Sequence, residues 1–363
     1  MLNINSERNG FMIKTKLAVR LIAAFTVFSV ICAFFSGCSD KYTEFTSFSM
    51  GSVLTARIYT DDSVEAENLR EAINTACEEA DNALSSTDKD AEIYHLNHNK
   101  RIIASEFLKN TLMDIIMVSN TLERKVDVSV GEITKLWGFT SSEPSVPEKN
   151  ALDSAVKARD IEKILIDTDS TMIIIEDDIS LDTGAFGKGV ACDAAFESIK
   201  NATSPLIMTL GGTVMAFGEG PSKGKWTVGI RNPFDSADSY FATLKLAPLS
   251  PKNAVFVSTS GSYEKTFTEN SVTYHHILDP ETGYPVDNGL VSVTVIAHSG
   301  LNADALSTAL FVNGFNDDAL QLLKSFSAEA VFVFSDGSYY VTQGLTQSFT
   351  LTDDSFTLKE YAQ

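Results

Sequence analysis

Two oxygen-bearing side chains, Asp304 and Thr308, lie four residues apart in the sequence. In a helix this spacing places both side chains on the same face. A carboxylate and a hydroxyl suit Mg²⁺, which keeps part of its water shell and shares phosphate oxygens. Such a pair is more often a capped helix end than a metal site, so the pair alone leaves both interpretations open.

The adjacent residues His275 and His276 could supply a titratable base. Neighbouring side chains on a strand point to opposite faces, so this pair cannot chelate one zinc ion and at most one imidazole faces a given site. The following segment, Asp279–Pro285, contains glycine and prolines that would hold the base at a rigid strand end. The pattern predicts one general base, and a histidine that only packs in the core is the alternative.

The segment Leu181–Gly189 runs from an expected strand end through three glycines into an expected helix. Glycines let the backbone approach a ligand closely, and the first amides of a helix suit phosphate. A second glycine pair, Gly211 and Gly212, follows the next expected strand. Any tight strand-to-helix turn could look similar. The chain has no G-x-G-x-x-G fingerprint, no P-loop and no G-x-S-x-G elbow.

Taken together, these segments resemble the FAD:protein FMN transferase (ApbE-like) family over roughly residues 45–335. The motifs that carry the resemblance are, in chain order, Met50–Ser52, Leu84–Asn97, Val126–Gly131, Leu136–Phe139, Asp182–Gly189, Gly211–Gly212, Thr259–Gly261, His276–Pro285 and Ala303–Thr308.

The resemblance implies a function. In that family the enzyme binds FAD with Mg²⁺, transfers FMN through a phosphoester bond to a Thr or Ser of a target flavoprotein, and releases AMP. It therefore implies FAD as substrate, Mg²⁺ as cofactor, and acceptor flavoproteins such as subunits of membrane redox complexes as partners. The implied fold is that of the flavin transferases.

The resemblance also implies site residues. The metal ligands would be Asp304, Thr308 and the backbone carbonyl of Ala185, and His276 would activate the acceptor hydroxyl. The residues that would contact the flavin dinucleotide are Met50, Thr87, an expected strand of Lys125, Val126 and Asp127, and then Asp182, Lys188 and Leu278.

Three departures from the family pattern bear on this assignment. Thr87 stands where many relatives carry tyrosine, which removes an aromatic stack, and Ser307 stands where some carry a second aspartate. The turn Asp182–Gly189 reads Asp-Thr-Gly-Ala-Phe-Gly-Lys-Gly rather than the commoner Asp-Leu-Gly-Gly-Ile-Ala-Lys-Gly. Two alternatives to transfer stay open: an FAD pyrophosphatase that releases FMN and AMP, and a non-catalytic flavin-binding or solute-binding lipoprotein.

The elements that must position these residues predict an α+β fold of mixed sheets and packed helices, because strands and helices come in clusters rather than in strict alternation. Hydrophobic periodicity predicts helices at 63–84, 105–122, 187–200, 302–313 and 316–325. The expected strands are 43–60 with a break at Met50–Ser52, then 161–166, 171–175, 179–182, 205–210, 226–231, 241–246, 254–258, 263–267, 290–297 and 329–334, with an edge strand within 345–358 and a loop at 140–150.

The N-terminus has the pattern of a bacterial lipoprotein signal. Lys14, Lys16 and Arg20 precede an apolar run, Leu21–Phe35, which is short for a membrane-spanning helix and ends at Cys38. We therefore expect a signal peptide at 1–37 and a flavin transferase domain at 38–363, diacylated at Cys38. This predicts a lipid anchor at the outer face of a bacterial membrane; an ordinary secretory signal or an uncleaved anchor is the alternative.

Charge and cysteine content exclude several classes of protein. The 363 residues carry a net charge of −20, and 24 basic and 47 acidic residues remain after position 37, a charge of −23. Such a field repels phosphate backbones, which argues against nucleic-acid binding. Cys77 and Cys192, in expected helices, are predicted to be small core residues, with a buried disulfide as the minority alternative.

Overall fold

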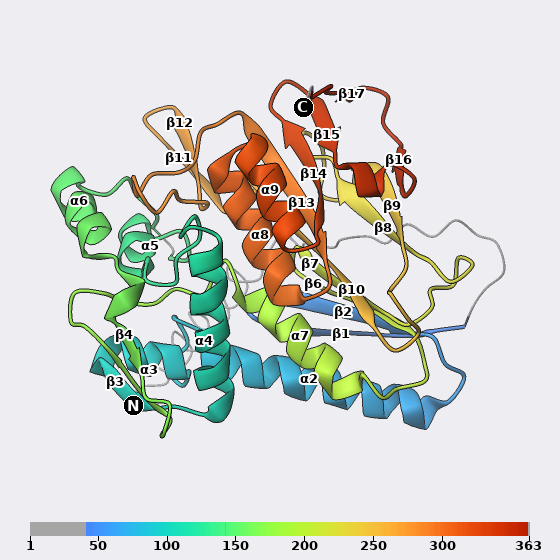
Figure 1. Ribbon diagram of the computed structural model, residues 1–363, viewed down its shortest axis with the longest axis horizontal. Helices are drawn as coiled ribbons and strands as arrows, with labels where there is room; N and C mark the ends of the chain where they lie inside the picture. Colours follow the sequence, from blue (N-terminus) through green and yellow to red (C-terminus); the bar gives the residue numbers. More distant parts are fainter. Residues whose placement is uncertain (1–40, 142, 362–363) are drawn as a thin grey trace, which may run out of the picture.

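A nine-stranded sheet forms the centre of the computed structural model, which describes residues 41–141 and 143–361 (Figure 1). Neighbouring strands are antiparallel except for the last pair, which is parallel. In spatial order the strands are β1 (Thr43–Ser49), β2 (Ser52–Ile58), β6 (Leu206–Leu210), β7 (Thr213–Phe217), β10 (Ala254–Gly261), β13 (Leu290–Ala297), β14 (Glu329–Phe334), β15 (Ser338–Val341) and β17 (Thr357–Leu358).

Helices cover one face of this sheet, as Figure 1 shows. They are α2 (Ser63–Leu84), α7 (Gly187–Ile199), α8 (Gly300–Asn313) and α9 (Asp317–Ser325). The main hydrophobic core lies between these helices and the sheet. The other face packs against a three-stranded sheet of β16 (Phe349–Leu351), β9 (Tyr240–Leu246) and β8 (Trp226–Arg231) through a second core. The fold class is therefore α+β, as the sequence predicts.

The remaining elements form a flank beside the ends of α7 and α8. The helices there are α3 (Glu92–Asn99), α4 (Glu106–Thr121), α5 (Gly131–Trp137) and α6 (Lys149–Ala158), with the short 3₁₀ helices η1 (Ile161–Lys163) and, elsewhere, η2 (Gln343–Leu345). The strands are β3 (Arg101–Ile103), β5 (Met172–Ile175) and β4 (Ile164–Ile166), which form one small sheet, and the hairpin of β11 (Thr266–Glu269) and β12 (Val272–His275). A third core, around Trp137, joins α5 and α6 to the hairpin.

Most strongly periodic segments form the elements that the sequence predicts. The helix expected at 63–84 matches α2 residue for residue, and the break at Met50–Ser52 is the turn between β1 and β2. Elements without a strong pattern are missed by the sequence analysis: they are α3, α5, α6, β3, β7, β12 and β15, and α6 begins inside the expected loop, at Lys149.

Two expected strands are wrong. In the segment 179–182 only Ser180 forms an isolated bridge, because the side-chain amide of Asn97 takes up both backbone groups of Leu181, at 2.6 and 2.9 Å. Residues 125–127 form a turn rather than a strand. The Asp127 carboxylate accepts hydrogen bonds from the amide and hydroxyl of Ser129, at 2.8 and 2.6 Å, which curls the backbone.

A third strand is shifted. The segment expected at 263–267 begins as a turn, and the strand runs from Thr266 to Glu269.

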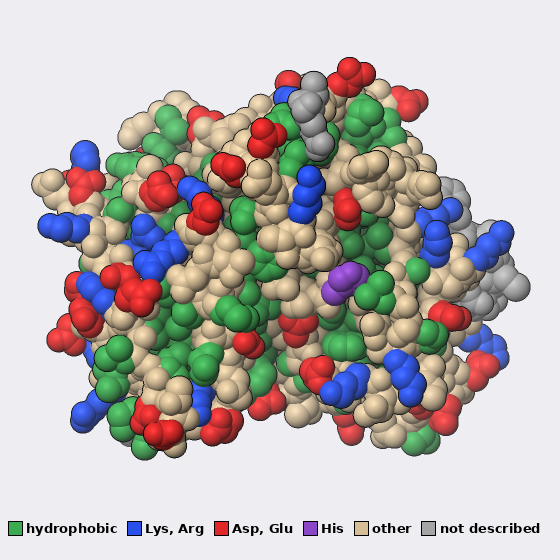
Figure 2. All heavy atoms as spheres, viewed as in Figure 1, with side chains coloured by type: hydrophobic (Ala, Val, Ile, Leu, Met, Phe, Trp, Pro, Cys, Tyr) green, Lys and Arg blue, Asp and Glu red, His purple; other side chains and the backbone are tan. Residues whose placement is uncertain are grey.

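Both cysteines within the described ranges, Cys77 and Cys192, are buried and free, which confirms them as core residues. Burial raises the pKa of the Cys77 thiol to about 12, so this thiol is unreactive. Cys38 lies outside the described residues. Among the helices that are described, none is long and apolar enough to cross a bilayer. Acidic and basic side chains are interspersed on the face that Figure 2 shows.

Candidate functional site

The glycine-rich turn before α7 meets helix α8 at very short range. A Cβ atom added to Gly189 would lie 2.2 Å from the carbonyl oxygen of Gly300, so only glycine lets the two helices approach so closely. On α7, Asp193 accepts hydrogen bonds from the amides of Gly300 and Leu301, at 2.6 and 2.8 Å, and caps the start of α8. This packing fixes the position of Asp304 relative to the turn.

Asp304 lies in the second turn of α8 and is only 4% exposed. One carboxylate oxygen accepts from the amide of Gly189 at 3.0 Å, and the other accepts from the hydroxyl of Ser258, on β10, at 2.9 Å. Asp304 thus joins α7, α8 and the sheet at one point. Each oxygen retains lone pairs beyond these bonds, so the carboxylate can still act as a ligand.

Hydroxyl groups surround the position one turn after Asp304. The Ser260 hydroxyl lies 2.8 Å from that of Ser307 and 2.9 Å from that of Thr308. Asp304, Thr308 and the carbonyl of Ala185, two residues before α7, would form an all-oxygen set, which fits a hard divalent cation such as Mg²⁺. No group of three His, Cys, Asp or Glu side chains within the described ranges could hold a metal, so such an ion would need water or substrate oxygens as further ligands.

Met50 and Lys188 extend the site towards the edge of the sheet. Met50 has a φ of 52°, and its amide donates a hydrogen bond to the Asp81 carboxylate at 2.7 Å. Its methyl group lies 2.6 Å from the position that a Cβ atom on Gly187 would take. The Lys188 side chain passes over Gly211: a Cβ atom added to Gly211 would lie 3.3 Å from Lys188 Cδ. The β1–β2 turn and the β6–β7 turn therefore both reach the glycine-rich turn.

Asp182 is held at the start of that turn. Its carboxylate accepts from the Thr134 hydroxyl at 2.8 Å and from the Gly184 amide at 2.7 Å. The side chain is half-buried, so it fixes the turn while part of it stays open to a ligand.

The two histidines have different hydrogen-bond partners. His275 Nε2 donates to the carbonyl of Val286 at 2.9 Å, and its Nδ1 accepts from the amide of Ile277 at 3.2 Å, so both ring nitrogens are engaged. His276 Nδ1 donates to the carbonyl of Glu264 at 3.0 Å. A carbonyl can only accept, so the proton of the neutral His276 ring sits on Nδ1 and Nε2 is left as a base.

The surroundings of His276 keep its imidazole neutral. Burial lowers the pKa of His276 to about 3, and the positive charges of Lys265 and Lys188 lower it as well. The carbonyl of Glu264 opposes this shift only in part. The ring is therefore an unprotonated base at neutral pH.

The structure brings most of the predicted site residues together, with two on a separate side. Met50, Asp182, Lys188, Asp304 and Thr308 gather around the glycine-rich turn through the contacts above, and Ala185 is part of that turn. His276 is linked to the turn through the charge of Lys188, which lowers the pKa of His276. Lys125 and Leu278 lie on the side of the Trp137 core, where Lys125 pairs with Glu281 at 3.3 Å. Thr87 is exposed, and within the described ranges its hydroxyl has only that of Ser85 as a hydrogen-bond partner, at 3.5 Å, so it stands apart from the other site residues.

The side chains of two predicted contact residues are engaged by other parts of the protein. The Asp127 carboxylate is buried and pairs with Arg159 at 2.8 Å, and Val126 lies in the main core. Only the backbone of these two residues could touch a ligand. Sequence reasoning missed the environment of Lys265 and Glu264 beside His276, because no spacing in the sequence marks them.

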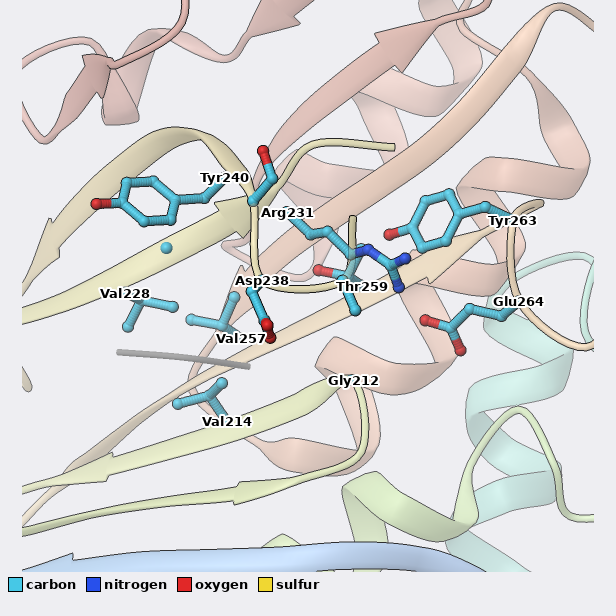
Figure 3. Close-up of a pocket in the computed structure, with 13 residues that line it drawn as sticks. Gly212, Val214, Val228, Arg231, Asp238, Tyr240, Val257, Thr259, Tyr263 and Glu264 are labelled. Atoms are coloured by element: carbon cyan, nitrogen blue, oxygen red, sulfur yellow. The ribbon is translucent and has the colours of Figure 1, made fainter. Parts of the chain in front are cut away.

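A small cavity lies behind the site, between the nine-stranded sheet and β8–β9. Its volume is about 50 Å³, whereas ligand pockets span about 300–1,000 Å³. Figure 3 shows Arg231 beside the ring of Tyr263, with a distance of 4.6 Å from the guanidinium carbon to the ring centre, and Glu264 close by. This cavity has room for a few water molecules and cannot hold a dinucleotide.

Comparison with known proteins gives consistent matches. A model of the ApbE family matches residues 50–332. A protein of Haemophilus influenzae called "FAD:protein FMN transferase" is 27% identical over 346 residues, which cover 90% of this chain and 97% of that protein. A protein of Escherichia coli K12 with the same name is 27% identical, with 80% and 87% covered. The crystal structure of an ApbE protein from Thermotoga maritima has a TM-score of 0.76 and 26% identity, with 85% and 99% covered.

Proposed function

The chain belongs to the ApbE family, and from this premise we propose that it is an FAD:protein FMN transferase. It attaches FMN through a phosphoester bond to a Thr or Ser of an acceptor flavoprotein and releases AMP. The observation that carries the proposal is that Asp304 is bonded to the glycine-rich turn that carries Lys188, whose charge in turn acts on His276. A base, a cation and an oxygen ligand set are what cleavage of a diphosphate requires.

His276 is the residue that accepts the proton of the acceptor hydroxyl. Its Nδ1–H is fixed on the carbonyl of Glu264, so Nε2 presents a lone pair. The hydroxyl oxygen forms a bond to the FMN phosphorus while the bond from that phosphorus to the AMP oxygen breaks. The proton goes to Nε2, and AMP leaves with the electron pair of the broken bond.

Lys188 and the metal ligands neutralise charge. Mg²⁺ would be held by Asp304, Thr308 and the Ala185 carbonyl, and when bound it supplies positive charge to the diphosphate oxygens. The aliphatic part of the Lys188 side chain lies across Gly211. In a chain of net charge −20, a diphosphate needs these local positive charges.

The proposed location follows from the N-terminus. We propose that Cys38 is diacylated after removal of 1–37 and that two acyl chains hold the enzyme at the outer face of a bacterial membrane. Its acceptors would then be flavoproteins exposed on that side.

One assay tests the function. Purified protein is mixed with FAD, Mg²⁺ and a candidate acceptor flavoprotein, and the denatured acceptor is examined for covalent flavin fluorescence. We expect a fluorescent acceptor band that is absent with EDTA and restored by excess Mg²⁺. Conversion of FAD to free FMN and AMP, with no labelled acceptor, would instead support a pyrophosphatase. Binding of FAD without any cleavage would support a binding protein.

A further inference from the structure

The β11–β12 hairpin places Lys265 directly beside His276. The last residue pair of the hairpin is Thr266 on β11 with His275 on β12. Lys265 and His276 are the next residues of the two chains, so they stand opposite each other. The hydrogen bond of 3.0 Å from His276 Nδ1 to the carbonyl of Glu264 draws the two chains together at this point. Lys265 and His276 therefore lie together at the open end of the hairpin.

The positive charge of Lys188 acts on Lys265, which indicates that the two ammonium groups lie in one region of the site. Within the part of the chain that the structure describes, no ion pair includes either ammonium group. The surrounding protein lowers the pKa of Lys265, and the charge of Lys188 lowers it further, while Asp182 and Glu264 act in the opposite direction. The Lys265 side chain itself is exposed.

Acidic residues are abundant in this protein, yet among the residues that the structure describes none forms an ion pair with Lys188 or Lys265. The chain has 48 acidic and 28 basic residues, so a random neighbour of a lysine is more often acidic. The nearby Asp182 carboxylate is engaged by Thr134 and Gly184. Two like charges in one region without an ion-pair partner raise the energy of the free protein, and an anion bound there removes that cost.

The backbone of Lys265 is also strained. Its φ is 43°, in the left-handed region that a side chain with a Cβ disfavours and that glycine adopts freely. Strain of this kind persists at positions where the surrounding structure imposes it, and it concentrates at functional sites. A glycine would adopt this φ with less strain, so the lysine is unfavourable for the local backbone.

We infer that Lys265 is a second phosphate-binding lysine that, with Lys188, binds the diphosphate of FAD. The inference rests on the proposed function. The bond between the FMN phosphorus and the AMP oxygen breaks, and the leaving phosphate gains one negative charge. The attacking and leaving oxygens lie on opposite sides of the FMN phosphorus. Lys265 lies beside the base, so its ammonium group is assigned to the non-bridging oxygens of the diphosphate rather than to the leaving oxygen.

The experiment compares Lys265→Met with Lys223→Met. Lys223 has the same left-handed backbone, with a φ of 56°, but lies in an exposed turn beyond the opposite end of β7. Both changes remove one positive charge, so they alter the net charge of the protein equally. Binding of AMP and of FAD is measured by titration calorimetry without an acceptor, and FMN transfer is measured in single turnover.

We expect Lys265→Met to weaken binding of AMP and FAD by about 10- to 100-fold, the range for a lost charge-assisted hydrogen bond. The dependence of AMP affinity on salt concentration should decrease as well. Lys265→Arg, which retains the charge, should recover most of the affinity, and Lys223→Met should bind as the wild type does. Lys265→Gly should melt no lower than the wild type and yet bind AMP weakly, which separates charge from folding.

AMP and FAD affinities unchanged in Lys265→Met would overturn the inference, as would equal losses in Lys223→Met. These affinities are measured without an acceptor, so they test the phosphate-binding role of Lys265 even if the wild type transfers no FMN. In that case the transferase proposal fails, while a loss of AMP binding in Lys265→Met still supports the phosphate site.

Discussion

At the scale of single residues, His275 and His276 differ in what their ring nitrogens can still do. Both nitrogens of His275 are engaged by the backbone, and its ring packs against Phe311 at 5.8 Å. His276 is bonded through Nδ1 to a carbonyl, and no hydrogen bond to Nε2 is formed by the residues that the structure describes. The sequence predicts that the two side chains point apart but cannot show which hydrogen bonds each makes, because Glu264 and Val286 come from other turns.

The first prediction concerns His276. His276→Ala should lower FMN transfer by about 10²–10⁴-fold, the range for loss of a general base, while the affinity for FAD changes by only a few-fold. His275→Gln, the matched control, should lower stability but leave the turnover of the folded protein near the wild-type value. Single-turnover rates, flavin titration and melting curves are measured on both variants. Near wild-type turnover in well-folded His276→Ala would refute its role.

The same residue sets a pH dependence. The pKa of free His276 is lowered to about 3, mainly by burial, so between pH 5 and pH 8 the ring stays neutral. The pH profile of kcat/KM reports ionisations of the free enzyme. The decrease in kcat/KM that protonation of His276 causes should therefore occur far below pH 6.5, the ordinary pKa of histidine. A profile that loses half its value near pH 6.5 in the wild type, and not in His275→Gln, would instead implicate His275.

Asp304 combines a structural and a functional role. The spacing to Thr308 predicts a shared helix face, but the burial of Asp304 and its bonds to Gly189 and Ser258 depend on the packing of α7, α8 and β10. Removing the side chain would leave two donors unsatisfied, at about 1–3 kcal/mol each. Asparagine keeps an acceptor and removes only the charge, so it is the better probe.

The second prediction therefore uses Asp304→Asn. This variant should lose divalent-cation binding and most FMN transfer while remaining folded, because the amide is a weaker ligand than a carboxylate. The control is Asp193→Asn, which caps α8 without belonging to the proposed ligand set and should lower the melting temperature with little effect on metal affinity. Calorimetric titration with Mg²⁺ or Mn²⁺ checks both. Wild-type metal affinity in Asp304→Asn would exclude it as a ligand.

At the scale of elements, the site is made by the ends of helices and strands that are far apart in sequence. The strongly amphipathic helices and alternating strands could be predicted, since their periodicity is local. The turn at 125–127 and the irregular segment at 179–182 could not, because the side chains of Asp127 and Asn97 replace strand pairing there. Helices α5 and α6 are short, and their core around Trp137 is completed by the distant β11–β12 hairpin.

The third prediction concerns the crossing of α7 and α8. Gly189→Ala should destabilise the protein by at least about 1–3 kcal/mol, because its Cβ would overlap the carbonyl oxygen of Gly300 at 2.2 Å. It should also reduce transfer, since Asp304 would move away from the Gly189 amide. Ser198→Ala, at the exposed end of α7, should change stability by no more than about 0.5 kcal/mol. Chemical denaturation of the two variants measures this, and equal stability would contradict the close packing.

At the scale of the whole molecule, an acidic protein must bind a dianionic substrate. Its net charge of −20 gives no general attraction for FAD, so affinity depends on the positive charges at the site. Composition could predict this need and the family resemblance could indicate the substrate. Neither could reveal that Lys265 lies beside His276, because that position depends on the register of a two-stranded hairpin.

The fourth prediction concerns the anchor. The mature protein should begin at Cys38 with two acyl chains, because an apolar run too short to span a bilayer leads directly to this cysteine. Mass spectrometry of the N-terminal peptide measures the modification. Cys38→Ser should lack the lipid and leave the membrane fraction. A mature N-terminus at a later residue, or an intact 1–37 segment, would contradict it.

The central claim, that the site transfers FMN to a protein rather than to water, is tested most directly by counting products. Purified protein, FAD, Mg²⁺ and a candidate acceptor flavoprotein are incubated, and AMP, free FMN and covalent flavin on the acceptor are all quantified. The account predicts one AMP for each flavin bound to the acceptor, with little free FMN, and none of the three products in EDTA. Equal amounts of AMP and free FMN, with no flavin on the acceptor, would contradict it.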